Sequence, residues 1–261
     1  MDCRMDNRVA LITGASTGLG KAMALRFAGS GAKVAMLARR AEVLETARKE
    51  VQGAGGTARA YPCDVSNAGQ IEKTFAAIIR DFGQVDILVN NAGQSQTARF
   101  EEITDEIWQS DFDLKVFAAI RLCRLALPGM KSRRWGRIIN ILNIGAKAPR
   151  GGSAPTSVSR AAGLAITKVL AGEGAPHNVL VNALMTGLIR SDQWVRRHAQ
   201  LATNQSFDDF LAAQAKTMGI PLGRFGEAEE FANIACFLAS DAGSYITGTS
   251  INVDGNHSPV V

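Results

Sequence analysis

The sequence predicts a doubly wound α/β fold, in which a parallel sheet carries helices on both faces. Three observations predict it. Short β-branched runs alternate with longer amphipathic stretches along all 261 residues. The short runs are apolar on both faces, which is typical of strands in a covered parallel sheet. A glycine-rich segment also joins the first strand to the first helix, as the nucleotide-binding members of this class require.

The elements follow one another in a regular order. Seven strands are expected, at residues 9–13, 33–38, 57–61, 85–90, 137–142, 179–183 and 250–253. Between them, apolar residues recur at helical spacing near 19–29, 41–53, 67–82, 105–129, 157–173 and 227–239. Each strand–helix–strand unit should cross over with the right-handed sense. We therefore expect one domain that spans residues 1–261.

One segment, from about Gly187 to Gly226, breaks this alternation. It holds two helix-like pieces, Gln193 to Ala202 and Asp208 to Lys216, but no further strand. An insertion after a late strand lies over the carboxyl edge of such a sheet, where ligands bind. The segment is therefore predicted to be a mobile lid or substrate loop.

Composition excludes several classes of protein. With 46% hydrophobic and 20% charged residues, the chain can bury one sizeable core. The net charge of +5 is spread over 29 basic residues without a block of like charge, which argues against nucleic-acid binding. No signal peptide or membrane-spanning run is visible, and the cysteines (Cys3, Cys63, Cys123 and Cys236) lack metal-ligand spacing. These features predict a reduced, cytoplasmic protein without a metal site.

A dinucleotide site is predicted where the first strand ends. Strand 9–12 runs directly into a glycine-rich turn, and a helix begins near Lys21. Such a turn lets a pyrophosphate approach the backbone and meet the N–H groups at the positive end of the helix. The residues expected to bind it are Gly14, Ser16, Thr17, Gly18, Leu19 and Gly20.

The second strand predicts which dinucleotide is bound. A site specific for NAD places a carboxylate at this strand end, to accept hydrogen bonds from the ribose 2′-hydroxyl. Here the strand ends in Ala38, followed by Arg39 and Arg40. Two guanidinium groups match a 2′-phosphate in charge and geometry, so NADP(H) is expected. NAD stays the alternative if both arginines only solvate the strand end.

Further motifs resemble the short-chain dehydrogenase/reductase family. The turn has the spacing Gly-x-x-x-Gly-x-Gly, Asp64-Val65 follows the third strand, and Asn90-Asn91-Ala92-Gly93 follows the fourth. The resemblance extends to Val253-Asp254-Gly255. It implies a Rossmann-type domain with seven parallel strands, with Asp64 and Val65 near the adenine and Asn91, Ala92 and Gly93 near the ribose. It also implies a homodimer or homotetramer, built by pairing the helices near 105–129 and 157–173.

The catalytic positions depart from this family. Its members use a Ser, a Tyr, a Lys four residues later and an Asn on the preceding long helix. The positions that match these hold Asn143, Thr156, Arg160 and Lys115. No shift of the alignment restores the Tyr, because the only tyrosines are Tyr61 and Tyr245, and neither directly follows the fifth strand.

The four replacements retain part of the chemistry. An aliphatic hydroxyl such as that of Thr156 is a poor proton donor without help. Arg160 suits the nicotinamide ribose but stays protonated, and Asn143 keeps an amide that polarises a carbonyl. Lys115 gains a role as general acid or amine nucleophile if it is desolvated beside the nicotinamide pocket. The alternative is a lysine that faces solvent.

The segment after the sixth strand completes the candidate site. The backbone near Gly187 and Ile189 is expected to meet the nicotinamide carboxamide, and Ser191 the cofactor phosphate. Arg190 together with Lys115, Arg150 and Arg160 suggests an anionic substrate. His198, in the predicted lid, is a weaker catalytic candidate.

Three functions fit these residues. The preferred one is an NADP(H)-dependent oxidoreductase that acts on a small carbonyl or alcohol with a non-standard proton donor. Hydride transfer needs only a positioned nicotinamide and carbonyl, whereas the proton can come from another group. The replaced catalytic residues leave open a catalytically inactive dinucleotide-binding sensor or partner subunit. A lyase or isomerase that uses Lys115 is the third possibility.

Overall fold

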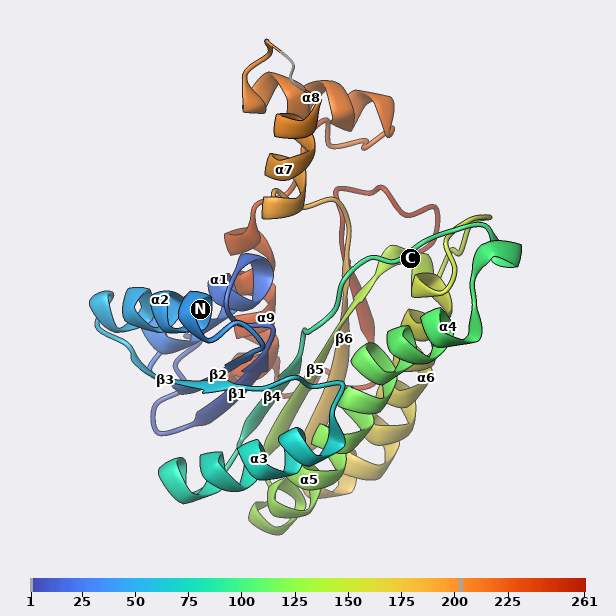
Figure 1. Ribbon diagram of the computed structural model, residues 1–261. Coiled ribbons are helices and arrows are strands. Elements are labelled where there is room, and N and C mark those ends of the chain that lie inside the picture. The colour runs from blue at the N-terminus through green and yellow to red at the C-terminus, as the bar shows by residue number, and fades with distance from the viewer. Residues whose placement is uncertain (1, 202–203) are drawn as a thin grey trace.

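One sheet of seven parallel strands forms the centre of the molecule, in the order β3-β2-β1-β4-β5-β6-β7 (Figure 1). The computed structural model describes residues 2–201 and 204–261, apart from the side chains at positions 192 and 193. The strands are β1 (Val9–Thr13), β2 (Lys33–Ala38), β3 (Thr57–Pro62), β4 (Ile87–Asn90), β5 (Gly136–Asn143), β6 (Val179–Thr186) and β7 (Ser250–Val253). The predicted doubly wound α/β fold is confirmed.

The strand order reverses between β1 and β4. The chain builds outward from β1 to β3, then returns to place β4 on the other side of β1, where Leu11 pairs with Leu88. A crevice forms outside the carboxyl ends of the strands at such a reversal. β6 is longer than predicted, because it continues to Thr186 and pairs there with Val253 of β7.

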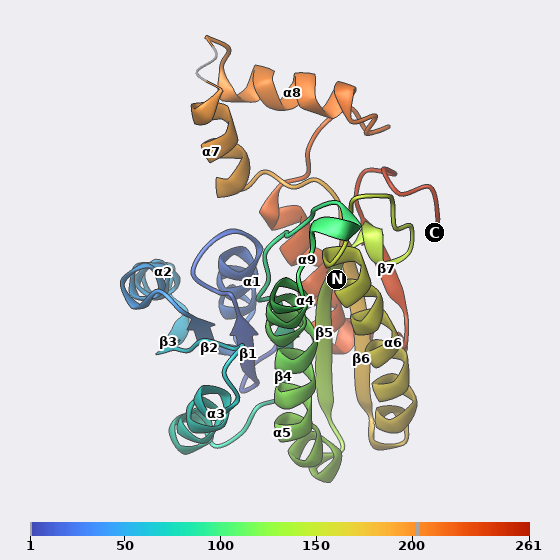
Figure 2. The same cartoon turned by 45° about the vertical axis from the view of Figure 1, so that its right-hand side comes forward.

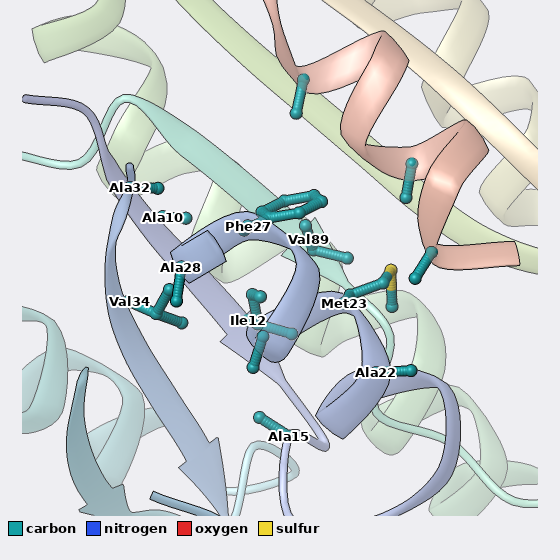
Figure 3. Packing of buried hydrophobic residues seen from close by; sticks show 14 of the residues in the cluster. Ala10, Ile12, Ala15, Ala22, Met23, Phe27, Ala28, Ala32, Val34 and Val89 are labelled. Carbon is teal, nitrogen blue, oxygen red and sulfur yellow. The ribbon is translucent and has the colours of Figure 1, made fainter. Parts of the chain in front are cut away.

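Helices cover both faces of the sheet (Figure 2). One face carries α1 (Gly18–Gly29), α2 (Ala41–Gly53) and α9 (Ala228–Ala239), and the other carries α3 (Ala68–Phe82), α5 (Ala118–Arg133) and α6 (Thr156–Gly174). Met23 and Phe27 of α1 pack with Ile12 and Val89 of the sheet in the first of these layers (Figure 3). Short turns of 3₁₀-helix lie at Phe100–Glu102, Ile144–Ala146, Ala175–His177 and Asp241–Gly243.

The helix predicted near 105–129 contains an irregular turn. α4 (Asp105–Phe112) passes into a single π-helical turn, η2 (Asp113–Phe117), before α5 continues beyond Pro128 to Arg133. Such wide turns are rare inside helices and occur frequently at functional sites. This one contains Lys115.

The insertion forms two helices that stand above the carboxyl edge of the sheet, α7 (Asp192–Gln200) and α8 (Phe207–Thr217) (Figure 1). Ala202, the last residue of the first predicted piece, lies outside the described residues. The insertion has an apolar cluster of its own, formed by Trp194, Phe210, Leu211, Ala215, Ile220 and Phe225. Across the described residues, no helix combines the length and apolar character that crossing a membrane would need.

Candidate active site

A groove runs along the carboxyl edge of the sheet, across the point where the strand order reverses. It consists of two adjoining hollows of about 470 Å³ each. The first lies over β1, β2 and β3, and the second lies over β5, β6 and the base of α7. Both are lined by Gly14, Thr17, Ala92, Gly93 and Gln94, so the groove is continuous.

The glycine turn leaves backbone donors open at the centre of the groove. α1 begins at Gly18 without a side-chain cap from Thr17 and without an acidic residue in its first turn. Its first N–H groups and the positive end of its dipole are therefore available to an anion. Gly20 packs so tightly that a Cβ atom there would lie 2.2 Å from the carbonyl oxygen of Gly14. Except for Gly18, the residues predicted in this turn line the groove: Gly14, Ser16, Thr17, Leu19 and Gly20.

Arg39 and Arg40 lie at the outer end of the first hollow. Both are exposed, and neither forms an ion pair with the part of the chain that the structure describes. Val65 lines the same hollow. Asp64 lies at the same strand end, but its carboxylate accepts hydrogen bonds from the backbone N and Oγ of Ser66, at 3.0 and 2.7 Å. Among the residues that the structure describes, no carboxylate lines this hollow.

Asn91 holds the glycine turn against the end of β4. Its Nδ2 donates to the carbonyl oxygens of Thr13 and Gly14, at 2.8 and 3.3 Å. The Thr13 hydroxyl accepts from the backbone N of Asn91 and of Ala92, each at 2.9 Å. Gly93 follows, and a Cβ atom there would lie 2.5 Å from Nη2 of Arg160. The absence of a side chain at this position makes room for that guanidinium.

Thr156 begins α6 and is buried, although it lines the second hollow. Its Oγ1 donates to the carbonyl oxygen of Gln96 at 2.7 Å. The same atom accepts from the Gln96 backbone N at 2.9 Å and from Nζ of Lys115 at 3.0 Å. The hydroxyl thereby ties the loop after β4 and the π-helical turn to the start of α6.

Lys115 is buried behind Thr156, so the alternative of a lysine that faces solvent is wrong. Its side chain is 1% exposed, and its ammonium forms an ion pair with Asp111, whose side chain is also 1% exposed. Burial lowers the pKa of Lys115, and the Arg160 charge lowers it further, whereas Asp111 acts against both. Lys115 lines a separate internal cavity of about 20 Å³ and does not line the groove itself.

Arg160 connects this internal cavity with the groove. It lines both, together with Ala92, Ile141 and Leu142. Its Nη1 donates to the carbonyl oxygen of Ile141 at 2.6 Å, whereas its buried Nε has no hydrogen-bond partner among the described residues. Burial lowers the pKa of Arg160 to about 10, so the guanidinium stays charged at neutral pH. The cavity has room for about one water molecule.

Asn143 ends β5 and lines the second hollow. Its Oδ1 is buried and has no hydrogen-bond partner among the described residues. Gly187, Ile189 and Ser191, which follow β6, line the same hollow. Of the predicted catalytic residues, Asn143, Thr156 and Arg160 thus line the groove itself, whereas Lys115 and the weaker candidate His198 do not.

The cationic cluster expected for an anionic substrate is not assembled. Arg190 lines the second hollow, but it forms ion pairs with Asp208 of α8 and with Glu227. Lys115 is paired with Asp111 behind the groove, and the exposed Arg150 lines neither hollow. Arg160 is therefore the one member of the predicted cluster that lines the groove without a carboxylate partner among the described residues.

His198 lies on α7 of the insertion and not in the groove. Its Nε2 lies 3.0 Å from the carbonyl oxygen of Gln205, and its ring packs against Phe207 and Phe210. It is absent from the lining of both hollows.

Sequence reasoning missed three parts of this site. The first is Asp111, whose position four residues before Lys115 was a usable signal, because such residues face each other on a helix. The second is Trp194, which lines the second hollow and packs edge-to-face on Phe225 with ring centroids 4.9 Å apart. The third is the loop that contains Gln94 and Ser95, which carries no recognisable motif.

Comparisons with known proteins agree with this geometry. The family model for enoyl-(acyl carrier protein) reductase matches residues 14–256. The 3-oxoacyl-(acyl-carrier-protein) reductase FabG of Thermotoga maritima is 32% identical over 97% of this chain and 98% of its own. L-sorbose reductase from Gluconobacter frateurii, solved with NADPH and L-sorbose, is 33% identical with a TM-score of 0.94 and 100% coverage of both chains.

A further solved structure has an unusual site. It is the NADPH-bound short chain oxidoreductase from Pseudomonas aeruginosa PAO1, described as containing an atypical catalytic center. It is 35% identical to this chain, with a TM-score of 0.92 and 99% coverage of each chain. The matches span nearly the full length of this chain and of these relatives, and they share the fold that carries the groove. The chain belongs to the short-chain dehydrogenase/reductase family and is an oxidoreductase of that type.

Proposed function

We propose that this protein is an NADPH-dependent oxidoreductase that reduces a small carbonyl compound, with Lys115 supplying the proton through Thr156. The proposal rests mainly on one observation, the hydrogen bond between Lys115 and Thr156. Lys115 donates a hydrogen bond to Thr156, and the threonine in turn lines the groove. A buried ammonium is thus connected to the place where a carbonyl would be reduced.

The groove fits a phosphorylated dinucleotide. The open N–H groups at the start of α1 suit the pyrophosphate, and the exposed Arg39 and Arg40 suit a 2′-phosphate. The guanidinium of Arg160, which lines the groove, suits the hydroxyls of the nicotinamide ribose. Two relatives of known structure hold NADPH, which supports the same cofactor here. NADPH, when bound, supplies the hydride that converts the carbonyl into an alkoxide.

The chain's own residues then supply the proton. The Nδ2 group of Asn143 donates a hydrogen bond to the carbonyl oxygen and stabilises the negative charge that develops there. The Thr156 hydroxyl turns from Gln96 to the alkoxide, gives it a proton and takes one from Lys115. Because the threonine gains a proton as it loses one, it never has to exist as an alkoxide. The net result is an alcohol product and a neutral Lys115 amine.

This mechanism predicts how the reaction depends on pH. Reduction needs protonated Lys115, so its rate falls as the pH rises through the pKa of Lys115, which burial places below the usual 10.5. The variant Lys115→Met should lose this alkaline decline and lower kcat by about 10²- to 10⁴-fold. Steady-state reduction of a carbonyl panel between about pH 6 and 10 measures both effects. The control is Lys131→Met, at a half-buried lysine further along the same helical run that pairs with Glu173 and lies away from the groove, and it should leave both unchanged.

A sensor that binds the cofactor without turnover is the second candidate. The observation that favours it is that Thr156 Oγ1 already makes three hydrogen bonds, two with Gln96 and one with Lys115. NADPH fluorescence titration and the carbonyl panel separate the candidates. Tight binding without turnover of any carbonyl compound would favour the sensor, and failure to bind either nicotinamide coenzyme would remove both.

A further inference from the structure

Asp111 is a buried carboxylate for which neither the sequence motifs nor the reaction above provides a role. It lies on α4, one helical turn before Lys115, and its Oδ1 contacts the Lys115 ammonium. Its Oδ2 is buried and has no hydrogen-bond partner among the described residues. Other acidic residues of α4, such as Asp105 and Glu106, are exposed. Burying a carboxylate costs desolvation free energy unless an opposite charge beside it compensates, as the Lys115 ammonium does here.

The surroundings of Lys115 explain why a negative charge is needed there. α6 presents Arg160, whose positive charge acts against the Lys115 ammonium. The polar side chains that β4 and β5 present to the internal cavity, Asn90 and Asn140, are neutral amides, and the α5 residues that line it are apolar. Asp111 is therefore the one negative charge that faces Lys115 among the residues the structure describes. Without it, two cations would be buried side by side with no counter-charge.

We propose that Asp111 is a positioning residue that keeps Lys115 charged and directs its ammonium to Thr156. This inference rests on the proposed function, because it assigns the partner of the proton donor. Asp111 occupies one N–H of the ammonium, while a second N–H donates to Thr156 Oγ1 at 3.0 Å. When Lys115 has passed a proton to Thr156, Asp111 is still a carboxylate, so the neutral amine readily takes up the next proton. Asp111 itself gives up no proton in the cycle.

The first test measures the protonation of Lys115 directly. The 13Cε chemical shift of Lys115 is followed by NMR through a pH titration of the folded protein without cofactor or substrate. Asp111→Asn keeps the shape and one acceptor oxygen but removes the charge, so the titration midpoint should fall by about one pH unit or more. The matched control is Asp113→Asn, which removes a carboxylate that faces Arg121 at 3.5 Å instead of Lys115. An unchanged midpoint in Asp111→Asn would overturn the inference.

The second test separates positioning from general damage. In Asp111→Asn the alkaline decline of reductase activity should move to lower pH by the same amount, and kcat should fall. The KM for the carbonyl compound and the Kd for NADPH should stay within about twofold, because the groove does not include Asp111. Asp111→Glu, which restores the charge, should regain part of the lost kcat. Equal losses in the Asn and Glu variants would contradict the inference.

Two results, an inactive wild-type protein and an Asp111→Asn variant that does not fold, are interpreted with separate measurements. If the wild-type protein reduces no carbonyl compound, the proposed function fails, while the cofactor-free titration still decides whether Asp111 keeps Lys115 charged. If Asp111→Asn does not fold, the double variant Asp111→Asn with Lys115→Met removes the unpaired ammonium. Recovery of folding in the double variant would support the pairing. A double variant as unstable as the single one would overturn it.

Discussion

At the scale of single residues, Thr156 shows how a hydroxyl can be retained while its chemistry changes. The phenol that the family uses at this position becomes a stable anion far more readily than an aliphatic hydroxyl does. In this chain the hydroxyl is fixed by Gln96 and Lys115. In the mechanism that we propose, the lysine therefore gives up the proton, and the threonine only transmits it.

At the same scale, Arg39 and Arg40 are predicted to decide which coenzyme is bound. Replacing either by Ala should weaken NADPH binding about tenfold and leave NADH binding almost unchanged, because only NADPH carries the 2′-phosphate. Both side chains are exposed, so the preference for NADPH should also shrink as salt is added. Fluorescence titrations at two ionic strengths measure this, with Arg134→Ala as the control. Equal losses for both coenzymes would show that the arginines do not read the phosphate.

At the scale of elements, the helical run from Asp105 to Arg133 shows what periodicity could and could not predict. Apolar spacing located the run, but the π-helical turn at Asp113–Phe117 has no signature in a pattern of 3.6 residues. The direction in which Lys115 points depends on that turn. Sequence reasoning therefore named the residue and left open whether it was buried.

The insertion that holds α7 and α8, predicted to be a lid, has an apolar core of its own. Phe210 is 3% exposed in the cluster beneath α7 and α8. Phe210→Ala should remove about 3–5 kcal/mol of packing from this cluster. Amide hydrogen exchange should then accelerate across residues 188–226, while the sheet stays protected and the KM for the carbonyl compound rises. Phe231→Ala in α9 is the contrasting control, because it should lower the stability of the body instead. Acceleration throughout the sheet in Phe210→Ala would show that the lid is not an independent unit.

At the scale of the whole molecule, apolar side chains remain exposed on η2 and α6. Phe117, Val158 and Val169 are 39%, 44% and 60% exposed. The dimer or tetramer implied by the family resemblance stays a prediction that these residues make testable. Light scattering should give the mass of at least a dimer for the wild-type protein. Val169→Glu should give a smaller species, because the new carboxylate would be buried without a partner between the subunits and would weaken their association. Val195→Glu, on the lid, is the control and should leave the mass unchanged. A wild-type monomer would contradict the prediction.

At the same scale, contacts between segments that are distant in the sequence are what the sequence could not predict. Strand and helix positions follow from local patterns of burial, so the sheet and the glycine turn could be derived. Ion pairs between residues that are far apart in the sequence could not be derived in this way. Arg190 was expected to serve a substrate, yet it pairs with Asp208 and Glu227, which lie 18 and 37 residues further along the chain. Such pairs form only once the insertion has folded above the sheet.

The hydrogen bonds of Thr156 to Gln96 and Lys115 also bear on whether a tyrosine can be introduced at this position. A tyrosine at position 156 either displaces Gln96 and Lys115, or it turns away and deprives both of an acceptor. Each outcome costs stability, because a buried donor loses its acceptor. Thr156→Tyr alone is therefore expected to lower the stability of the folded protein. Changing Lys115 and Asp111 together with Thr156 should relieve this cost, because it removes the buried ammonium and its counter-charge.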